Sequence, residues 1–288
     1  MRIAHLSDLH FYRCSYQPMQ LLSKRWVGNF NFFFHRRFQH STKPLFSLPK
    51  LLKHLAVTHV IITGDLTTTS LPEEYDLAFF YVHLLKQWKF HVFVIPGNHD
   101  HYTKHSYQVQ RFYQYFPPAF SSNSFNLKDH KVTKCHLTEQ WSLVALDTVI
   151  PTPLTASNGL LSTSAEAHLL QLMEHIPQSK KILLINHFPF LQNDRAKRLL
   201  LRGERLQSIF RQYPNICFYL HGHTHHSSTI DLRAEHLPIT LDSGSLSHRS
   251  HGSWLLIEIS QEAYQCTTYR YQRERWQKSD CVTFSPYL

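Results

Sequence analysis

The chain repeats one pattern of hydrophobic and polar positions: a short apolar run ends in a turn that carries Asp, Asn or His. Apolar runs of about four to eight residues bounded by turn residues predict buried strands. The strands expected in this way span residues 2–7, 57–63, 90–96, 181–186 and 216–220. In sheets covered by helices, ligands bind at the carboxyl ends of the strands. We therefore expect the polar turns to lie together at one edge.

Helical spacing separates several of these runs. Residues 72–88 carry apolar side chains three or four positions apart, with Glu73 and Glu74 near the start, where acidic groups suit the helix dipole. The strands on either side complete a βαβ unit, for which a right-handed crossover is expected. Ser162 or Thr163 can cap a helix over residues 164–176.

Other segments give weaker patterns. Residues 51–56 resemble a helix end, residues 101–116 predict a helix or an ordered loop, and residues 195–205 predict a helix. Residues 125–147 alternate in short runs that predict antiparallel strands of a second sheet. Two more strands are expected around 237–241 and 254–259. Since we find no repeat or low-complexity linker, we expect one domain over residues 1–288, with an aromatic and basic insertion at about 11–50 and a basic extension at about 260–288.

The turns bring together carboxylates, an amide and imidazoles. They are Asp8-Leu9-His10, Gly64-Asp65, Gly97-Asn98-His99-Asp100, Asn186-His187 and Gly222-His223-Thr224-His225. Alternation along an extended backbone would place Asp8 and His10 on one side, where both reach a single ion. Two divalent ions about 3.5–4 Å apart neutralise a phosphate ester and generate a hydroxide. Mixed oxygen and imidazole ligands suit manganese, iron or zinc better than calcium. The turns therefore predict a dinuclear metal site for phosphoester chemistry.

In this order, the five motifs resemble those of the calcineurin-like metallophosphoesterase superfamily over roughly residues 1–260. The resemblance implies an α/β fold, a four-layer α/β/β/α sandwich with a dinuclear site at the strand ends. It implies that the first ion is held by Asp8, His10, Asp65 and His225, and the second by Asn98, His187 and His223, with Asp65 bridging. The ions would be manganese, with iron or zinc as alternatives.

The resemblance also implies the catalytic roles. His99 would contact the phosphate and protonate the leaving oxygen, with Asp100 orienting its ring. The nucleophile would be a metal-bound hydroxide, so no covalent enzyme intermediate is expected. Five other histidines are expected to be structural: His59, His91, His101, His226 and His248.

Net charge and cysteine content indicate the class of partner and the cellular compartment. The formal net charge of +10 favours anionic partners, although a generally basic proteome would give the same value. The five cysteines are scattered without a CxxC motif, which favours a reducing compartment. A strand begins within two residues of Met1 and no apolar run approaches the roughly 18 residues of a membrane span, so a cytoplasmic protein is expected.

Two segments each allow more than one interpretation, and the class of substrate depends on which is correct. Residues 26–38 combine six aromatic residues with two arginines. They predict either a loop or hairpin folded onto the body, or a flap that meets a nucleobase, a single strand or a lipid interface. The basic segment 195–205 is either a solvated face or a wall for an anionic substrate.

The resemblance is nearest to the branch with cyclic-nucleotide phosphodiesterase-like and UDP-diacylglucosamine pyrophosphatase-like enzymes. We expect a metal-dependent phosphodiesterase or pyrophosphatase acting on a nucleotide-containing substrate. The alternatives are a lipid-linked UDP-sugar pyrophosphatase docked peripherally on a membrane, a nuclease, and a non-catalytic metal-binding scaffold. The sequence does not indicate an oligomeric state.

Overall fold

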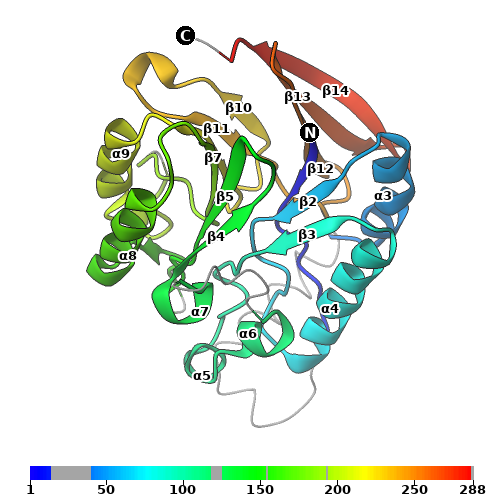
Figure 1. Ribbon diagram of the computed structural model, residues 1–288. Helices are drawn as coiled ribbons and strands as arrows, with labels where there is room; N and C mark the ends of the chain where they lie inside the picture. The colour runs from blue at the N-terminus through cyan, green and yellow to red at the C-terminus, as the bar shows by residue number, and fades with distance from the viewer. Residues whose placement is uncertain (14–39, 118–124, 154, 193, 287–288) are drawn as a thin grey trace.

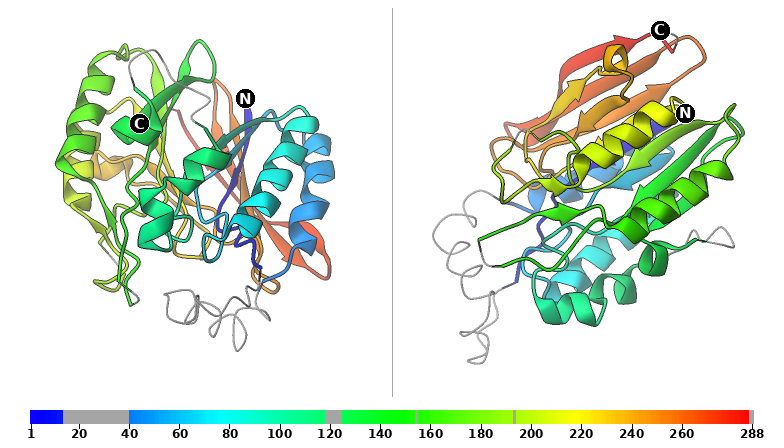
Figure 2. Two further views of the ribbon diagram at one scale, coloured as in Figure 1. Left: turned by 90° about the horizontal axis from the view of Figure 1, so that it is seen from below. Right: turned by 90° about the vertical axis from the view of Figure 1, so that its left-hand side faces the viewer.

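Two stacked β-sheets with helices on both outer faces form four layers (Figures 1 and 2). The computed structural model describes residues 1–13, 40–117, 125–153, 155–192 and 194–286. Among these residues, no helix has the length and apolar character needed to cross a membrane. The arrangement confirms the expected α/β/β/α sandwich.

The first sheet is built around the N-terminal strand. Its order is β14-β13-β12-β1-β2-β3, in which β1, β2 and β3 are parallel and the other pairs antiparallel. The strands are β1 (Arg2–Leu6), β2 (His59–Ile62), β3 (His91–Val94), β12 (Ser253–Ile259), β13 (Tyr264–Gln272) and β14 (Arg275–Phe284). The C-terminal segment, for which sequence patterns gave no structure, is thus part of this sheet.

The second sheet has a similar plan. Its order is β10-β11-β9-β7-β5-β4, with β5, β7, β9 and β11 parallel and an antiparallel strand at each edge. The strands are β4 (Val132–His136), β5 (Trp141–Leu146), β7 (Lys181–Ile185), β9 (Ile216–His221), β10 (Ser228–Ile230) and β11 (Ile239–Asp242). A separate pair joins β6 (Gly159–Leu160) to β8 (Leu200–Leu201).

Helices cover the outer face of each sheet (Figures 1 and 2). The first sheet carries α3 (Lys43–His54) and α4 (Pro72–Gln87), and the second carries α8 (Thr163–Glu174) and α9 (Gly203–Gln212). The Ser162 hydroxyl caps α8 by accepting from the Ala165 N–H at 3.1 Å, as expected. The short helices are α5 (Lys104–Gln108), α6 (Arg111–Tyr115), α7 (Leu127–His130) and η3 (Arg233–Glu235).

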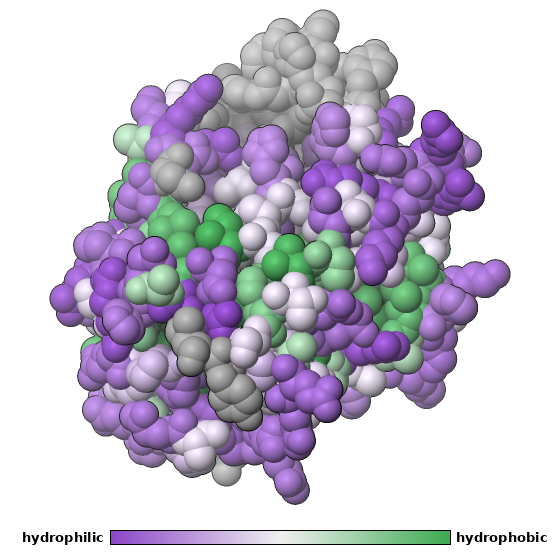
Figure 3. Space-filling view, turned by 90° about the horizontal axis from the view of Figure 1, so that it is seen from above, coloured by the Kyte–Doolittle hydropathy of each residue, from purple (hydrophilic) through white to green (hydrophobic). Residues whose placement is uncertain are grey.

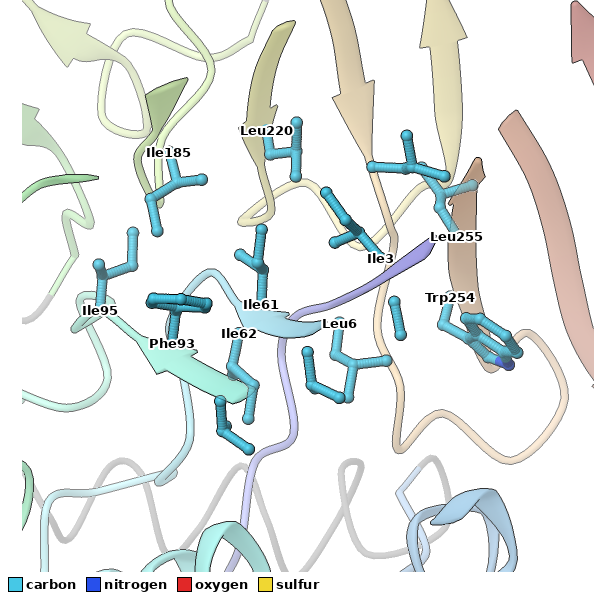
Figure 4. Close-up of a cluster of buried hydrophobic side chains, with 14 of the residues drawn as sticks. Ile3, Leu6, Ile61, Ile62, Phe93, Ile95, Ile185, Leu220, Trp254 and Leu255 are labelled. Carbon is cyan, nitrogen blue, oxygen red and sulfur yellow. The ribbon is translucent and has the colours of Figure 1, made fainter. Parts of the chain in front are cut away.

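Strand alternation produces two hydrophobic cores. The molecular surface seen from above is mostly hydrophilic with separate hydrophobic patches (Figure 3). Inside, Ile185 of β7 points toward the first sheet, where Ile61 points back toward it (Figure 4). Its neighbour Leu184 belongs to the other core, under α8 and α9. Each fully buried aliphatic side chain of this kind stabilises the fold by about 1.5–3 kcal/mol.

Two expectations of secondary structure were wrong. Residues 127–130 form α7 rather than a strand, because the Asn126 side chain caps a turn by accepting from the Asp129 N–H at 2.9 Å. Residues 195–205 do not form one helix: turns lead into β8, and α9 begins only at Gly203. The backbone of Arg202 is left-handed, with φ of 62°, so a helix cannot run through it. The aromatic segment 26–38 lies outside the described residues.

Candidate metal centre

The two sheets deliver the predicted residues from facing strand ends. The first sheet contributes Asp8 and His10 after β1, Asp65 after β2, and Asn98 and His99 after β3. The second sheet contributes His187 after β7 and His223 and His225 after β9. All of these side chains except His99 and His225 are buried. The centre therefore lies where the carboxyl ends of the two parallel strand sets meet.

Four side chains from three strand ends form a first group. One ligand atom from each of Asp8, His10, Asp65 and His225 lies within 4.8 Å of all the others. The Asp8 Oδ1 atom is 3.1 Å from His225 Nε2 and 3.6 Å from His10 Nε2. The two Nε2 atoms are 3.2 Å apart. Two carboxylates and two imidazoles thus converge on one point.

The side-chain oxygen of Asn98 organises a second group. It lies 3.1 Å from His187 Nε2 and 2.9 Å from His223 Nδ1. Asp65 lies between the groups, because its Oδ2 is 3.5 Å from His187 Nε2 and 3.9 Å from His10 Nε2. The His187 Nδ1–H donates to the Thr63 carbonyl at 2.7 Å, which turns the Nε2 atom toward the centre.

The residues of the first group leave their strands by a left-handed backbone. The φ angle is 55° at Asp8, 49° at His10, 52° at Asp65 and 62° at His225, and it is 72° at His223 of the second group. Non-glycine residues seldom adopt this conformation, and such residues cluster at functional sites. The expectation of an extended backbone at Asp8 and His10 was therefore wrong, although both side chains reach the same point. The His10 N–H donates to the Asp65 carbonyl at 3.0 Å and holds the two turns together.

Two glycines allow the turns to approach closely. A Cβ atom on Gly97 would lie 2.2 Å from Asp65 Oδ1, and one on Gly222 would lie 2.5 Å from Asp8 Oδ2. Real Cβ atoms are essentially never this close to another heavy atom. At these two positions glycine provides space beside a carboxylate.

His99 is oriented by a different group from the one expected. Its Nδ1–H donates to the Thr68 carbonyl at 2.6 Å, and its ring stacks on Tyr102 with centroids 5.3 Å apart. Asp100 is buried and turned elsewhere, because its carboxylate accepts from the backbone N–H groups of Leu66, Thr67 and Gly97. Asp100 therefore fastens the turns after β2 and β3 to each other.

Burial and charge act against each other in this centre. Burial alone would raise the pKa of Asp65, but the nearby imidazoles, His187 first, hold it below its ordinary value. Burial alone would lower the pKa of His187, but the Asp65 carboxylate raises it to about 9. Burial, followed by repulsion from His187, lowers the pKa of His223 to about 3. The Asp65 carboxylate and the His187 imidazole therefore each favour the charged form of the other, whereas burial favours the neutral form of His223.

Sequence reasoning missed Asp242, which supports the turn that carries His223 and His225. Its buried carboxylate accepts from the Thr224 hydroxyl at 2.6 Å and the Gly244 N–H at 2.8 Å, and it lies 3.3 Å from His221 Nδ1. The signal was present, because residues 237–242 are another apolar run that ends in Asp.

The histidines expected to be structural occupy varied positions. His59 and His91 stack on each other at the start of β2 and β3, away from the strand ends that carry the centre. His101 is buried beside Tyr107. His248 packs against His40, whose ring centroid is 5.1 Å from that of His10.

Curated proteins with similar sequences are named as phosphodiesterases. Over 176 residues the chain is 26% identical to a Coxiella burnetii protein named as a probable cyclic nucleotide phosphodiesterase, covering 60% of this chain and 62% of that protein. It is also 26% identical to an Arcobacter nitrofigilis protein named as a probable glycerophosphodiester phosphodiesterase, covering 59% of this chain and 57% of the relative. The chain thus spans less than two thirds of the length of either relative.

Solved structures with low sequence identity share the fold. A dimetal phosphatase from Danio rerio aligns over 99% of this chain and 98% of its own, with a TM-score of 0.61 and 11% identity. A purple acid phosphatase from yellow lupin (Lupinus luteus) aligns over 99% of this chain and 53% of its own, with a TM-score of 0.62 and 11% identity. The family profile described as calcineurin-like phosphoesterase matches residues 1–227. This chain therefore belongs to the calcineurin-like phosphoesterase family.

Proposed function

We propose that the chain is a metal-dependent phosphohydrolase that cleaves a phosphoester or pyrophosphate bond in a small nucleotide-containing substrate. The observation that carries the proposal is the convergence of Asp8, His10, Asp65 and His225 within 4.8 Å, beside a second group centred on Asn98. Two curated relatives are named as phosphodiesterases, which supports the same chemistry.

The donor atoms fit divalent cations. The Asp8 Oδ1 atom is buried and accepts no hydrogen bond within the described structure. His223 donates its Nε2–H to the Arg198 carbonyl at 3.1 Å, so in the neutral ring the Nδ1 lone pair faces the Asn98 oxygen. Electron-rich atoms that face each other in a buried site are stabilised by a cation between them. Mixed carboxylate, amide and imidazole donors suit manganese, iron or zinc.

In the proposed assignment the two groups hold one ion each. Asp8, His10, Asp65 and His225 hold the first, Asn98, His187 and His223 hold the second, and Asp65 bridges them. Two such ions supply charge neutralisation and a water of lowered pKa. The chain fixes their donors from both sides, with Asp8 and Asp65 on the first sheet and the three histidines on the second.

His99 is proposed as the general acid. Its Nδ1–H is committed to the Thr68 carbonyl, so the Nε2 atom is the one that can donate a proton to the leaving oxygen. The backbone N–H of His99 donates to Asp65 Oδ1 at 2.8 Å, which ties the acid to the bridging carboxylate. This hydrogen bond fixes the position of the proposed general acid relative to the proposed bridging ligand.

Manganese-dependent hydrolysis by the purified chain tests the proposal. The substrates are bis(p-nitrophenyl) phosphate, cyclic AMP, a nucleoside diphosphate sugar, UDP-diacylglucosamine and single-stranded DNA, and metal content is measured in parallel. We expect turnover of a nucleotide-containing substrate that disappears in the Asp65→Ala protein. Two bound ions without any hydrolysis would favour a scaffold, and preference for DNA would favour a nuclease.

A further inference from the structure

The basic segment 195–205 divides into two parts with different partners. On the far part, Arg202 and Arg205 bind the Glu166 carboxylate of α8, with 2.8 Å between Arg205 Nε and its Oε1. On the near part, Arg198 reaches the candidate centre, where its Nη2 donates to the His223 carbonyl at 3.0 Å. Arg198 is therefore the cation in this segment that the fold places beside the proposed second ion.

Arg198 brackets His223 with both its backbone and its side chain. Its carbonyl accepts from His223 Nε2 at 3.1 Å while its guanidinium binds the His223 carbonyl. The Asp194 carboxylate, 3.4 Å from Arg198 Nε, steadies the group from the other side. The guanidinium is thus fixed at the flank of the centre.

The Arg198 guanidinium has N–H groups that remain available to bind a ligand. Its side chain is 39% exposed, and the contacts above involve only Nη2 and Nε. An arginine offers five N–H donors in a planar fork, which matches the oxygens of a phosphate. A partly exposed, pre-positioned fork at the rim of a phosphate site is suited to a second anionic group.

We propose that Arg198 binds a phosphate adjacent to the scissile one, so that the centre favours a pyrophosphate-linked substrate over a simple diester. The inference rests on the proposed phosphohydrolase function. The scissile phosphate would lie over the two ligand groups, and the neighbouring phosphate would extend past His223 to Arg198. The formal charge of +10 agrees with a substrate that carries more than one negative charge.

Inhibition by inorganic phosphate and inorganic pyrophosphate tests Arg198 directly. Both anions compete in the manganese-dependent hydrolysis of bis(p-nitrophenyl) phosphate by the wild-type, Arg198→Gln and Arg198→Lys proteins. Glutamine removes the charge but keeps the backbone carbonyl that binds His223. Arg195→Gln, at an exposed position of the same segment, is the matched control.

We expect the inhibition constant of pyrophosphate to rise about 10–100-fold in Arg198→Gln, as for a lost charged hydrogen bond, and that of phosphate to change less than about threefold. Arg198→Lys lies between, and Arg195→Gln matches the wild type. Equal losses for both anions, or no loss for pyrophosphate, would overturn the inference. So would loss of metal in Arg198→Gln, since Arg198 would then act by holding His223.

Calorimetric titration of the manganese-loaded proteins with the same two anions repeats the comparison without turnover. If the wild type hydrolyses nothing but shows the selective loss of pyrophosphate affinity in Arg198→Gln, the proposed function fails and the anion site stands. If the wild type hydrolyses the diester and Arg198→Gln has no selective effect, only the inference fails.

Discussion

The two sheets share a plan but contribute different sets of donors to the centre. Each has a block of parallel strands with antiparallel strands beside it, and each presents its carboxyl ends to the same place. The first sheet supplies both carboxylates, Asp8 and Asp65, whereas the second supplies His187, His223 and His225. His10 and Asn98 of the first sheet lie beside these carboxylates, and the second sheet completes each group only when the sheets are stacked. A cation bound here would tie the two halves together.

Of the changes predicted here, Asp65→Asn should have the largest effect on metal binding and hydrolysis. Asparagine tolerates the left-handed backbone at this position, so the change removes charge without adding strain. Because Asp65 lies between both groups, we expect metal content and hydrolysis to fall to background together. Elemental analysis and turnover measure this, and a variant that retained both ions would contradict the bridging role.

His99→Ala should separate proton delivery from metal binding. We expect both ions to remain, because the side chain is bound to Thr68 rather than to a ligand atom. Turnover should fall about 10²–10⁴-fold, as for a lost general acid. The loss should be smaller for leaving groups of low pKa, such as p-nitrophenol. Loss of metal in this variant would show that His99 belongs with the ligands.

Asp242→Asn should reduce metal affinity, with a smaller effect than the two changes above. The change disturbs the contacts to Thr224 and Gly244 that hold the turn with His223 and His225. Loss of such a supporting carboxylate typically reduces metal affinity about 10–100-fold. Titration with manganese measures the effect, with Asp280→Asn at an exposed position of β14 as the control. Equal affinities in the two variants would exclude the supporting role.

The folded protein should lose stability at low pH because His101 is buried. Burial lowers the pKa of this histidine to about 4 from 6.5, although the charge of Asp147 opposes the shift. Below pH 6.5 the unfolded chain binds a proton that the folded chain cannot, so stability is lost as pH falls toward 4. The loss from this group is about 1.4 kcal/mol per pH unit.

The His101→Phe protein should lack this contribution. Its free energy of unfolding, measured by denaturant titration from pH 7 to pH 4.5, should fall less steeply than that of the wild type. Parallel pH profiles would mean that His101 is not the titrating group.

The sequence was sufficient where a local pattern determines the outcome. Apolar runs identified β1, β2, β3, β7 and β9 because a buried strand needs only a few consecutive apolar residues. The centre followed from the turns at the ends of those strands. The orientation of His99 could not be predicted, because the Thr68 carbonyl reaches it through a turn that carries no side-chain signal.

The pairing of β13 and β14 with distant parts of the chain could not be predicted from the sequence either. From the sequence, β13 and β14 were predicted only as a basic extension, because the buried residues of β13 are tyrosines, threonines and a cysteine rather than an aliphatic run, and β14 is mostly exposed. Their place follows from the antiparallel register with β12, which local patterns do not encode. Arg198 lies in a basic segment whose role the sequence left open, and Asp242 ends an apolar run, but only the three-dimensional contacts show what each side chain binds.

The position of β1 has a consequence for synthesis of the chain. This strand pairs with β2 on one side, but on the other side with β12, which begins at Ser253. At a translation rate of about 5–20 residues per second, its second edge waits for roughly 250 residues to emerge. During that interval an apolar strand edge is open to other nascent chains. A chain stopped before β12 would keep that edge exposed, so truncation products should aggregate rather than fold.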